Sequence, residues 1–178
     1  FDLGCVYQGY RSDISRTAVL GRPSDKQLRY YNAARDGEIA AIAAMKPGVP
    51  VSQIFETAMR VTRAHGMPHY ERHHVGHGIG LEPYDPPTIN AATHTALEPG
   101  MVFHMYTGAQ GMAFSETVLV TEGGAERLTR LEQEFARDPI FGDATVETNK
   151  ARTVARVTVP VAGNPDGERA IEGLAVIP

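Results

Sequence analysis

The sequence predicts an α+β fold in which antiparallel strands precede and follow a pair of helices. Three observations support this class. An N-terminal stretch of strand-forming residues is divided by Gln8–Gly9, a short turn of the kind that joins hairpin strands. A capping-box pattern at Ser24 opens an apolar segment of helical length. Strand-like runs separated by glycine-rich turns then follow from about residue 100.

The N-terminal hairpin is expected to pair residues 1–7 with residues 10–20. A two-residue loop places Leu3 opposite Ile14, and the rest of the register follows from that pair. The sequence opens in mid-strand without an initiator methionine, which suggests a piece of a longer protein.

Two acidic residues of this hairpin are expected to be neighbours. Because side chains alternate with period two, Asp2 and Asp13 become diagonal neighbours on one face, close enough for a single ion to join them. Carboxylates placed in this way repel each other unless a positive charge lies between them. The alternative is a pair of solvated acids on an exposed face.

Two helices are expected to follow. The first has Ser24 as N-cap and Gln27 at the third helical position, and ends near Met45, before Lys46-Pro47-Gly48. Its apolar stripe is expected to include Leu28, Tyr31, Ile39 and Ile42. The second helix follows Val51-Ser52 and ends at Gly66, with its buried face formed by Ile54, Phe55, Ala58, Met59 and Val61.

The C-terminal strands are expected at residues 102–106 and 113–121, joined by a glycine-rich loop at 107–111. A proline-rich loop at 83–87 precedes them. Glu116 is the only acid inside the last strand, and a carboxylate that points inward there needs a partner.

The segment from His73 to Pro83 contains three histidines within five residues, with glycines alternating around His77. Such glycines allow the backbone to approach whatever His77 faces, which is typical of a functional site. The alternative is a polar, glycine-rich turn with incidental histidines.

The candidate metal ligands come from three distant segments: Asp2, Asp13, His77 and Glu116. Three carboxylates and one imidazole suit one or two divalent ions such as Mn, Co, Fe or Zn, and the lack of thiolate ligands argues against a structural zinc site. Such a centre is typical of enzymes that hydrolyse an amide or related C–N bond.

Several motifs occur together in one order, and the chain from Asp2 to about Leu131 resembles the creatinase/aminopeptidase superfamily, which has the pita-bread fold. That superfamily includes Xaa-Pro aminopeptidase, Xaa-Pro dipeptidase (prolidase) and methionine aminopeptidase. The motifs are Asp2-Leu-Gly, Gly9-Tyr-Arg-Ser-Asp13-Ile-Ser-Arg-Thr17, His73-His-Val-Gly-His77-Gly-Ile-Gly, Leu97-Glu-Pro-Gly-Met101 and Ser115-Glu116-Thr117.

The resemblance implies a curved antiparallel sheet backed by helices, built of two pseudo-symmetric halves. Residues 1–131 would be the C-terminal part of this catalytic domain, and therefore a partial domain. Residues 132–178 form a tail that is either an extra hairpin or disordered, with one weak strand pattern at 153–161. Members of the superfamily generally act as dimers.

The resemblance also implies a role for each site residue. Asp2 would bind one ion, Asp13 and Glu116 would bridge two, and His77 would be the histidine ligand. His73 would be catalytic, because it matches the histidine that hydrogen-bonds the substrate near the scissile bond in the prolidase-like branch.

Two family positions are substituted. Tyr106 stands where the family has a further glutamate ligand, and Tyr84 stands where it has a second catalytic histidine. A phenol replaces a carboxylate poorly because its pKa is near 10. His104 lies two residues before Tyr106, on the same strand face, and could supply a substitute ligand. The alternative is a strand histidine that is hydrogen-bonded to a neighbour.

These observations predict a metal-dependent hydrolase of the Xaa-Pro peptidase type that cleaves a peptide or related C–N bond with a metal-bound hydroxide. The alternatives are a metal-independent, creatinase-like hydrolase of small molecules and a non-catalytic binding module with a degenerate site. The formal charge of −4 and pI near 6.0 argue against nucleic acid as a partner. Without a membrane-length apolar run, and with Cys5 as the single cysteine, a cytoplasmic location is expected. The resemblance implies a homodimer for the whole protein.

Overall fold

The computed structural model describes residues 2–17, 19, 23–129, 145–148 and 155–158. The chain divides into two units, and the boundary lies between Thr129 and Arg130. The first unit contains eleven elements in this order: β1 (Asp2–Leu3), β2 (Val6–Tyr7), β3 (Tyr10–Arg11), β4 (Ile14–Ser15), α1 (Asp25–Ala44), α2 (Val51–Ala64), β5 (Gly76–Gly78), β6 (Asp85–Thr88), β7 (Val102–Ala109), β8 (Met112–Thr121) and β9 (Gly124–Arg127).

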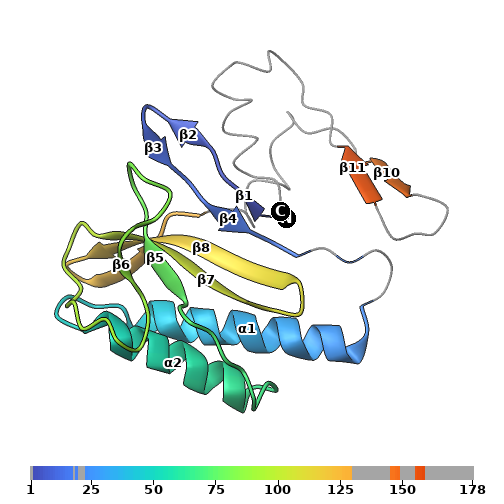
Figure 1. Ribbon diagram of the computed structural model, residues 1–178, viewed down its shortest axis with the longest axis horizontal. Coiled ribbons are helices and arrows are strands. Elements are labelled where there is room, and N and C mark those ends of the chain that lie inside the picture. Colours follow the sequence, from blue (N-terminus) through green and yellow to red (C-terminus); the bar gives the residue numbers. More distant parts are fainter. Residues whose placement is uncertain (1, 18, 20–22, 130–144, 149–154, 159–178) are drawn as a thin grey trace. The chain divides into compact units, whose positions relative to one another are not determined.

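A five-stranded antiparallel sheet in the order β6-β5-β7-β8-β9 is backed by α1 and α2 on one face (Figure 1). The side chains of β7 and β8 that point to the helices form the centre of the core: Phe103, Met105, Val118 and Val120, all fully buried. The sequence-based prediction of an α+β fold with an antiparallel sheet backed by helices is therefore confirmed.

The N-terminal hairpin has the predicted register. Leu3 pairs with Ile14, and Tyr7 pairs with Tyr10 across the turn at Gln8 and Gly9. The strands are shorter than expected, since β1–β4 and β2–β3 are separate two-residue pairs. Between the pairs, the Ser12 amide donates to the Cys5 carbonyl, and the Cys5 amide donates to the Ser12 hydroxyl. This side-chain bond replaces one rung of the ladder.

Helix α1 begins with the predicted capping box at Ser24 and ends at the predicted C-cap, Met45. Its predicted apolar stripe is partly wrong, because Leu28 and Ile39 are 45% and 50% exposed. The helix instead buries a face of small residues around one carboxyl group: Ala33, Ala34, Gly37, Glu38 and Ala41.

Close packing of α1 against α2 explains why small residues form the buried face of α1. A Cβ added at Gly37 would lie 1.9 Å from Thr62 Oγ1 and 2.9 Å from the Ala58 carbonyl oxygen on α2. Helices that approach so closely exclude large side chains from the contact. Helix α2 follows Pro50, which serves as its N-cap, and buries Ile54, Ala58 and Met59 as predicted.

Strands β5 and β6 differ from the sequence-based prediction, which has a functional-site segment or a glycine-rich turn at 73–83 and a proline-rich loop at 83–87. Strand β5 lies between β6 and β7, and glycine is required on both sides of His77. A Cβ at Gly76 would lie 2.6 Å from the His104 carbonyl oxygen, and one at Gly78 would lie 2.6 Å from the Pro86 carbonyl oxygen. The glycines therefore permit strand pairing here, whereas their composition suggested a turn.

Strands β7 and β8 are joined by a tighter turn than the predicted loop at 107–111. Strand β7 continues to Ala109, and the turn consists of Gln110 and Gly111, with φ values of 56° and 78°. Two positive φ values are typical of the type I′ hairpin turn. This turn sets the register of the whole hairpin, including Tyr106 opposite Ser115.

In the second unit, β10 (Thr145–Thr148) pairs with β11 (Ala155–Thr158) in an antiparallel manner. The weak strand pattern predicted at 153–161 includes β11. The remaining part of the predicted 132–178 tail lies outside the described residues, and the division of the chain at residue 131 stays a prediction. No helix among the described residues is long and apolar enough to cross a bilayer.

Candidate metal site

Three potential metal-binding side chains converge at the junction of the N-terminal hairpin and the sheet. Asp13, His77 and His104 each offer one ligand atom, and these atoms lie within 4.8 Å of one another. His77 and His104 are directly opposite each other in the β5–β7 ladder, with ring centroids 5.2 Å apart. Asp13 immediately precedes β4, which runs beside β8. Sheet pairing therefore places the imidazoles, and the hairpin supplies the carboxylate.

The His77 ring is buried and held in one orientation. Its Nδ1–H donates to the Gly78 carbonyl oxygen at 2.9 Å, which leaves Nε2 as the ring atom with a lone pair. The Tyr84 ring stacks on the His77 ring, with the two centroids 3.6 Å apart. Burial lowers the pKa of His77, so the imidazole is neutral at neutral pH.

His104 is held in a similar way. Its Nδ1–H donates to the backbone carbonyl of Asp13 at 3.0 Å, and its Nε2 lies 3.8 Å from Asp13 Oδ2. Burial, with a smaller contribution from His77, lowers the pKa of His104 to about 4. Both imidazoles are thus uncharged, and each keeps a lone pair on Nε2. This is the form in which histidine binds metal.

Asp2 and Asp13 lie side by side, as the hairpin register predicts. Asp2 Oδ1 accepts a hydrogen bond from the Ser15 hydroxyl at 2.7 Å. Burial, the negative charge of Asp2 and a hydrogen bond between the two side chains raise the pKa of Asp13 to about 6. A carboxylate pair of this kind is stabilised by a bound cation.

Glu116 lies apart from this cluster. Its partner in the ladder is Met105, so its side chain points to the helix face of the sheet, opposite to the face of His104. Glu116 Oε1 is 2.8 Å from Arg16 Nη2 and 3.5 Å from Arg127 Nη1. The sequence indicates that Glu116 needs a partner if it is buried. The partners are the two arginines, Arg16 and Arg127, and not a neighbouring metal ligand. The bridging role of Glu116 stays a prediction.

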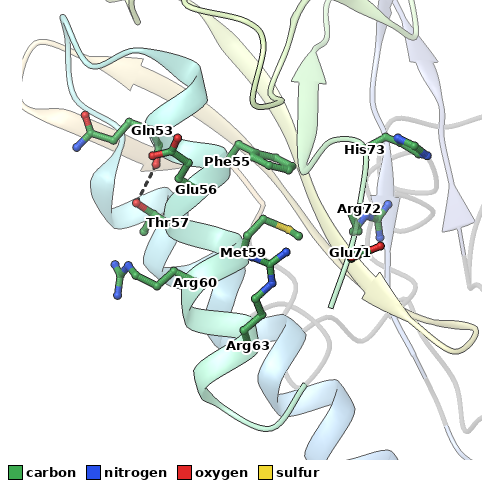
Figure 2. A pocket seen from close by; sticks show the side chains of 10 residues that line it. All are labelled: Gln53, Phe55, Glu56, Thr57, Met59, Arg60, Arg63, Glu71, Arg72 and His73. Carbon is green, nitrogen blue, oxygen red and sulfur yellow. Dashed lines mark hydrogen bonds between the residues drawn. The ribbon is translucent and has the colours of Figure 1, made fainter. Parts of the chain in front are cut away.

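His73, the predicted catalytic residue, is also outside the cluster. It is exposed at a hollow of about 960 Å³ that lies between α2 and residues 71–73 (Figure 2). Its neighbour His74 is the one that contacts the site, because His74 Nε2 is 2.9 Å from the Tyr84 hydroxyl. No sequence signal distinguishes His74 from its neighbours, and the role of His73 stays a prediction.

Tyr106 takes part in aromatic packing at the edge of the cluster. Its ring is nearly parallel to that of His104, with centroids 5.9 Å apart. The Arg72 guanidinium lies 4.2 Å from the Tyr106 ring centroid, in cation–π geometry. Tyr106 also lines a smaller hollow of about 430 Å³ together with Asp2, Arg16 and Arg72. The phenol at this position thus has packing partners of its own.

The donor set fits a divalent metal ion. One carboxylate and two neutral imidazoles, with candidate ligand atoms within 4.8 Å of one another, give three protein ligands, the number found in many catalytic sites. A second carboxylate, Asp2, lies next to the first and adds negative charge. The antiparallel sheet, the two backing helices and this donor set together define a domain of the α+β class with a candidate metal-binding site.

Comparison with known proteins identifies the family. Residues 1–122 match the metallopeptidase family M24, and the chain belongs to this family. It is 38% identical over 139 residues to a Xaa-Pro dipeptidase of Pyrococcus furiosus, an alignment that covers 75% of this chain and 40% of the relative. The confirmed resemblance is thus to prolidase-like metallopeptidases.

Solved structures agree with this assignment. The prolidase from Pyrococcus furiosus superimposes with a TM-score of 0.69 at 36% identity, covering 72% of this chain and 40% of that one. The X-Pro aminopeptidase from Thermotoga maritima gives a TM-score of 0.68 at 30% identity, covering 73% and 38%. The chain therefore spans about two fifths of the length of these relatives and represents part of their pita-bread domain.

Proposed function

We propose that the whole protein is a metal-dependent hydrolase of the Xaa-Pro peptidase type, and that this chain supplies its metal-binding part. The observation that carries the proposal is the meeting of Asp13 with His77. These residues come from separate motifs, and the resemblance to the family implies a ligand role for each. The Xaa-Pro dipeptidase and X-Pro aminopeptidase relatives support a peptide substrate with proline in the second position.

Asp13 and His77 would hold the ion. When bound, a divalent ion polarises the scissile carbonyl group and lowers the pKa of a water molecule. Asp13 keeps its carboxylate beside Asp2, and this negative charge favours a cation at the site. The Gly78 carbonyl fixes the tautomer of His77, and Tyr84 covers its ring and limits the access of water from that side.

The proposal extends to the partners and location of the whole protein. It would act as a cytoplasmic homodimer on peptides, with no role for nucleic acid or a membrane surface. The slightly acidic pI near 6.0 supports the exclusion of nucleic acid. Sedimentation equilibrium of the whole protein tests the dimer, and a mass of one chain at micromolar concentration would contradict it.

The proposed function is tested by hydrolysis of Xaa-Pro dipeptides after chelation and after readdition of Mn, Co or Zn. We expect activity to be lost with the chelator and restored by at least one ion. Asp13→Asn and His77→Ala should each lower kcat/KM by at least about 100-fold, because each removes a ligand. Activity that neither chelation nor these substitutions affect would overturn the proposal.

One observation favours a second candidate. Tyr84 stacks on His77 at 3.6 Å and contacts His74, an arrangement in which a histidine could act on a small substrate as an acid or base. In that case the protein would be a creatinase-like, metal-independent hydrolase of small C–N compounds. Hydrolysis of such compounds that persists after exhaustive chelation would support this candidate over the peptidase.

A further inference from the structure

We propose that His104 is a metal ligand, and that it forms with Asp13 and His77 a centre for one ion per chain, with two imidazoles and one carboxylate. The inference deepens the proposed function and rests on it only for the use of the ion in hydrolysis. The binding itself can be measured separately.

The positions of the two imidazole rings suit a shared ion. His77 and His104 occupy directly opposed positions of the β5–β7 ladder, so their side chains leave the same face of the sheet. Each ring donates its Nδ1–H to a backbone carbonyl, that of Gly78 and that of Asp13. Metal-binding histidines usually donate their second ring nitrogen in this way, because the bond fixes the tautomer and the ring plane.

The hairpin binds His104 through the residue that supplies the carboxylate. The backbone carbonyl of Asp13 accepts from Nδ1 of His104, while Oδ2 of Asp13 lies 3.8 Å from Nε2 of the same ring. The carboxylate oxygen thus lies close to the ring nitrogen that keeps its lone pair. His104 is 3% exposed, so its ring is shielded from water that would compete for the ion.

The donors at the site suit one ion. A second ion would need carboxylates besides Asp2 and Asp13, but Glu116 is on the other face of β8 and is paired with Arg16 and Arg127. Tyr106 is packed under the guanidinium of Arg72. Among the described residues, Asp13, His77 and His104 form the only cluster of histidine, cysteine and acidic side chains that meets the distance requirement. One ion therefore accounts for the donors that converge.

The chemistry of the donors sets the preference among ions. Imidazole nitrogen favours borderline ions such as Zn, Co(II) and Fe(II), whereas carboxylate oxygen favours Mn and Mg. A site that uses the His104 imidazole in place of a carboxylate is thus expected to shift its metal preference from Mn toward the borderline ions. Because most protein sites bind Co(II) more tightly than Mn(II), the informative quantity is the change in this ratio when residue 104 is altered.

The experiment titrates the metal-free whole protein with Co(II) chloride and Mn(II) chloride, using calorimetry for stoichiometry and the visible absorption of bound Co(II) for coordination. We expect one Co(II) per chain. His104→Ala should weaken Co(II) binding at least tenfold and change the spectrum. His104→Asp should retain binding but lower the ratio of Co(II) to Mn(II) affinity at least tenfold. His69→Ala is the matched control, because His69 is exposed and outside the cluster, and it should change neither quantity.

Three results would overturn the inference: two ions per chain, unchanged Co(II) binding in His104→Ala, or an unchanged affinity ratio in His104→Asp. His104→Asn, whose amide can still donate to the Asp13 carbonyl, guards against loss of folding and should also weaken Co(II) binding. Circular dichroism confirms that each variant is folded. Tight Co(II) binding without Xaa-Pro hydrolysis would sink the proposed function alone, whereas metal-dependent hydrolysis that is insensitive to residue 104 would sink this inference alone.

Discussion

Glu38 is a fully buried carboxyl group beneath the sheet. Its Oε2 accepts hydrogen bonds from the backbone amide and the hydroxyl group of Thr107, both at 3.0 Å, and its Oε1 has no hydrogen-bond partner among the described residues. Burial raises the pKa of Glu38 well above its usual range, despite these bonds. The folded protein therefore favours the protonated acid.

This shift predicts how stability depends on pH. The folded-state pKa of Glu38 is raised. The stability that protonated Glu38 contributes is therefore fully present below the unfolded-state pKa near 4.5, and it is lost as pH rises toward the raised folded-state pKa. The free energy of unfolding should fall with pH in that window, by at most about 1.4 kcal/mol per pH unit. Glu38→Gln keeps an acceptor for Thr107 and should remove this fall.

Urea unfolding of both proteins at several pH values measures the effect. Parallel pH profiles for the original protein and Glu38→Gln would contradict the assignment. Asp36→Asn is a suitable comparison, because Asp36 is on the same helix but its pKa is lowered, with His65 and Arg35 as hydrogen-bond partners. Its profile should retain the fall that Glu38 causes.

At the level of single residues, the sequence was sufficient to bring Asp2, Asp13 and His77 into one hypothesis. Their motifs are local, and the hairpin register follows from a two-residue turn. The position of Glu116 could not be predicted, because the face on which it lies depends on the turn at Gln110 and Gly111. A shift of one residue in this register moves every side chain of a strand to the other face.

At the level of elements, the contact between α1 and α2 depends on Gly37. Alanine favours a helix over glycine by about 1 kcal/mol, so Gly37→Ala would stabilise an isolated helix. In this protein the new Cβ would lie 1.9 Å from Thr62 Oγ1, and such overpacking costs about 1–3 kcal/mol. We expect a net loss of stability in chemical unfolding.

A double-mutant cycle tests the cause of this loss. Thr62→Ala removes the hydroxyl group that the new methyl group would meet, so Gly37→Ala should be less harmful in that background. The Ala58 carbonyl oxygen at 2.9 Å remains, and the rescue should therefore be partial. Additive effects of the two substitutions would show that the contact is not the source of the strain.

The elements that the sequence predicted well are those with local signals. The capping box located the start of α1, and Gln8–Gly9 set the hairpin register. Strand β5 consists of Gly76-His77-Gly78, and β6 contains two prolines, so neither has the composition of a strand. Their pairing arises from neighbours distant in sequence, and the exposure of Leu28 and Ile39 likewise reflects packing that a helical stripe does not reveal.

At the level of the whole first unit, the candidate metal site joins three separate segments. Asp13 comes from the hairpin, His77 from β5 and His104 from β7. A metal ion that binds only when these segments are assembled stabilises the folded state by about 2.7 kcal/mol at a free concentration 100 times Kd.

We therefore expect Co(II) or Zn to raise the Tm of the metal-free protein, and a chelator to reverse the change. His77→Ala should lose this response while His69→Ala keeps it. Differential scanning calorimetry provides the measurement. A rise in Tm that persists in His77→Ala would place the bound ion elsewhere in the protein.

The way the hairpin is attached bears on how fast a metal ion could enter and leave. Residues 14–17, which include β4, contact β8 through hydrogen bonds that involve side chains and not through a backbone ladder. These bonds join Ser15 to Ser115, Arg16 to Ser115 and Glu116, and Thr17 to Ala113. The imidazole pair is formed once the sheet has folded, whereas the Asp13 carboxylate arrives only when the hairpin docks. Local opening of this contact costs less than global unfolding. Undocking of the hairpin would thus be the gate for metal exchange, and the lifetime of the bound ion would depend on Ser15, Arg16 and Thr17, none of which is among the three proposed ligands.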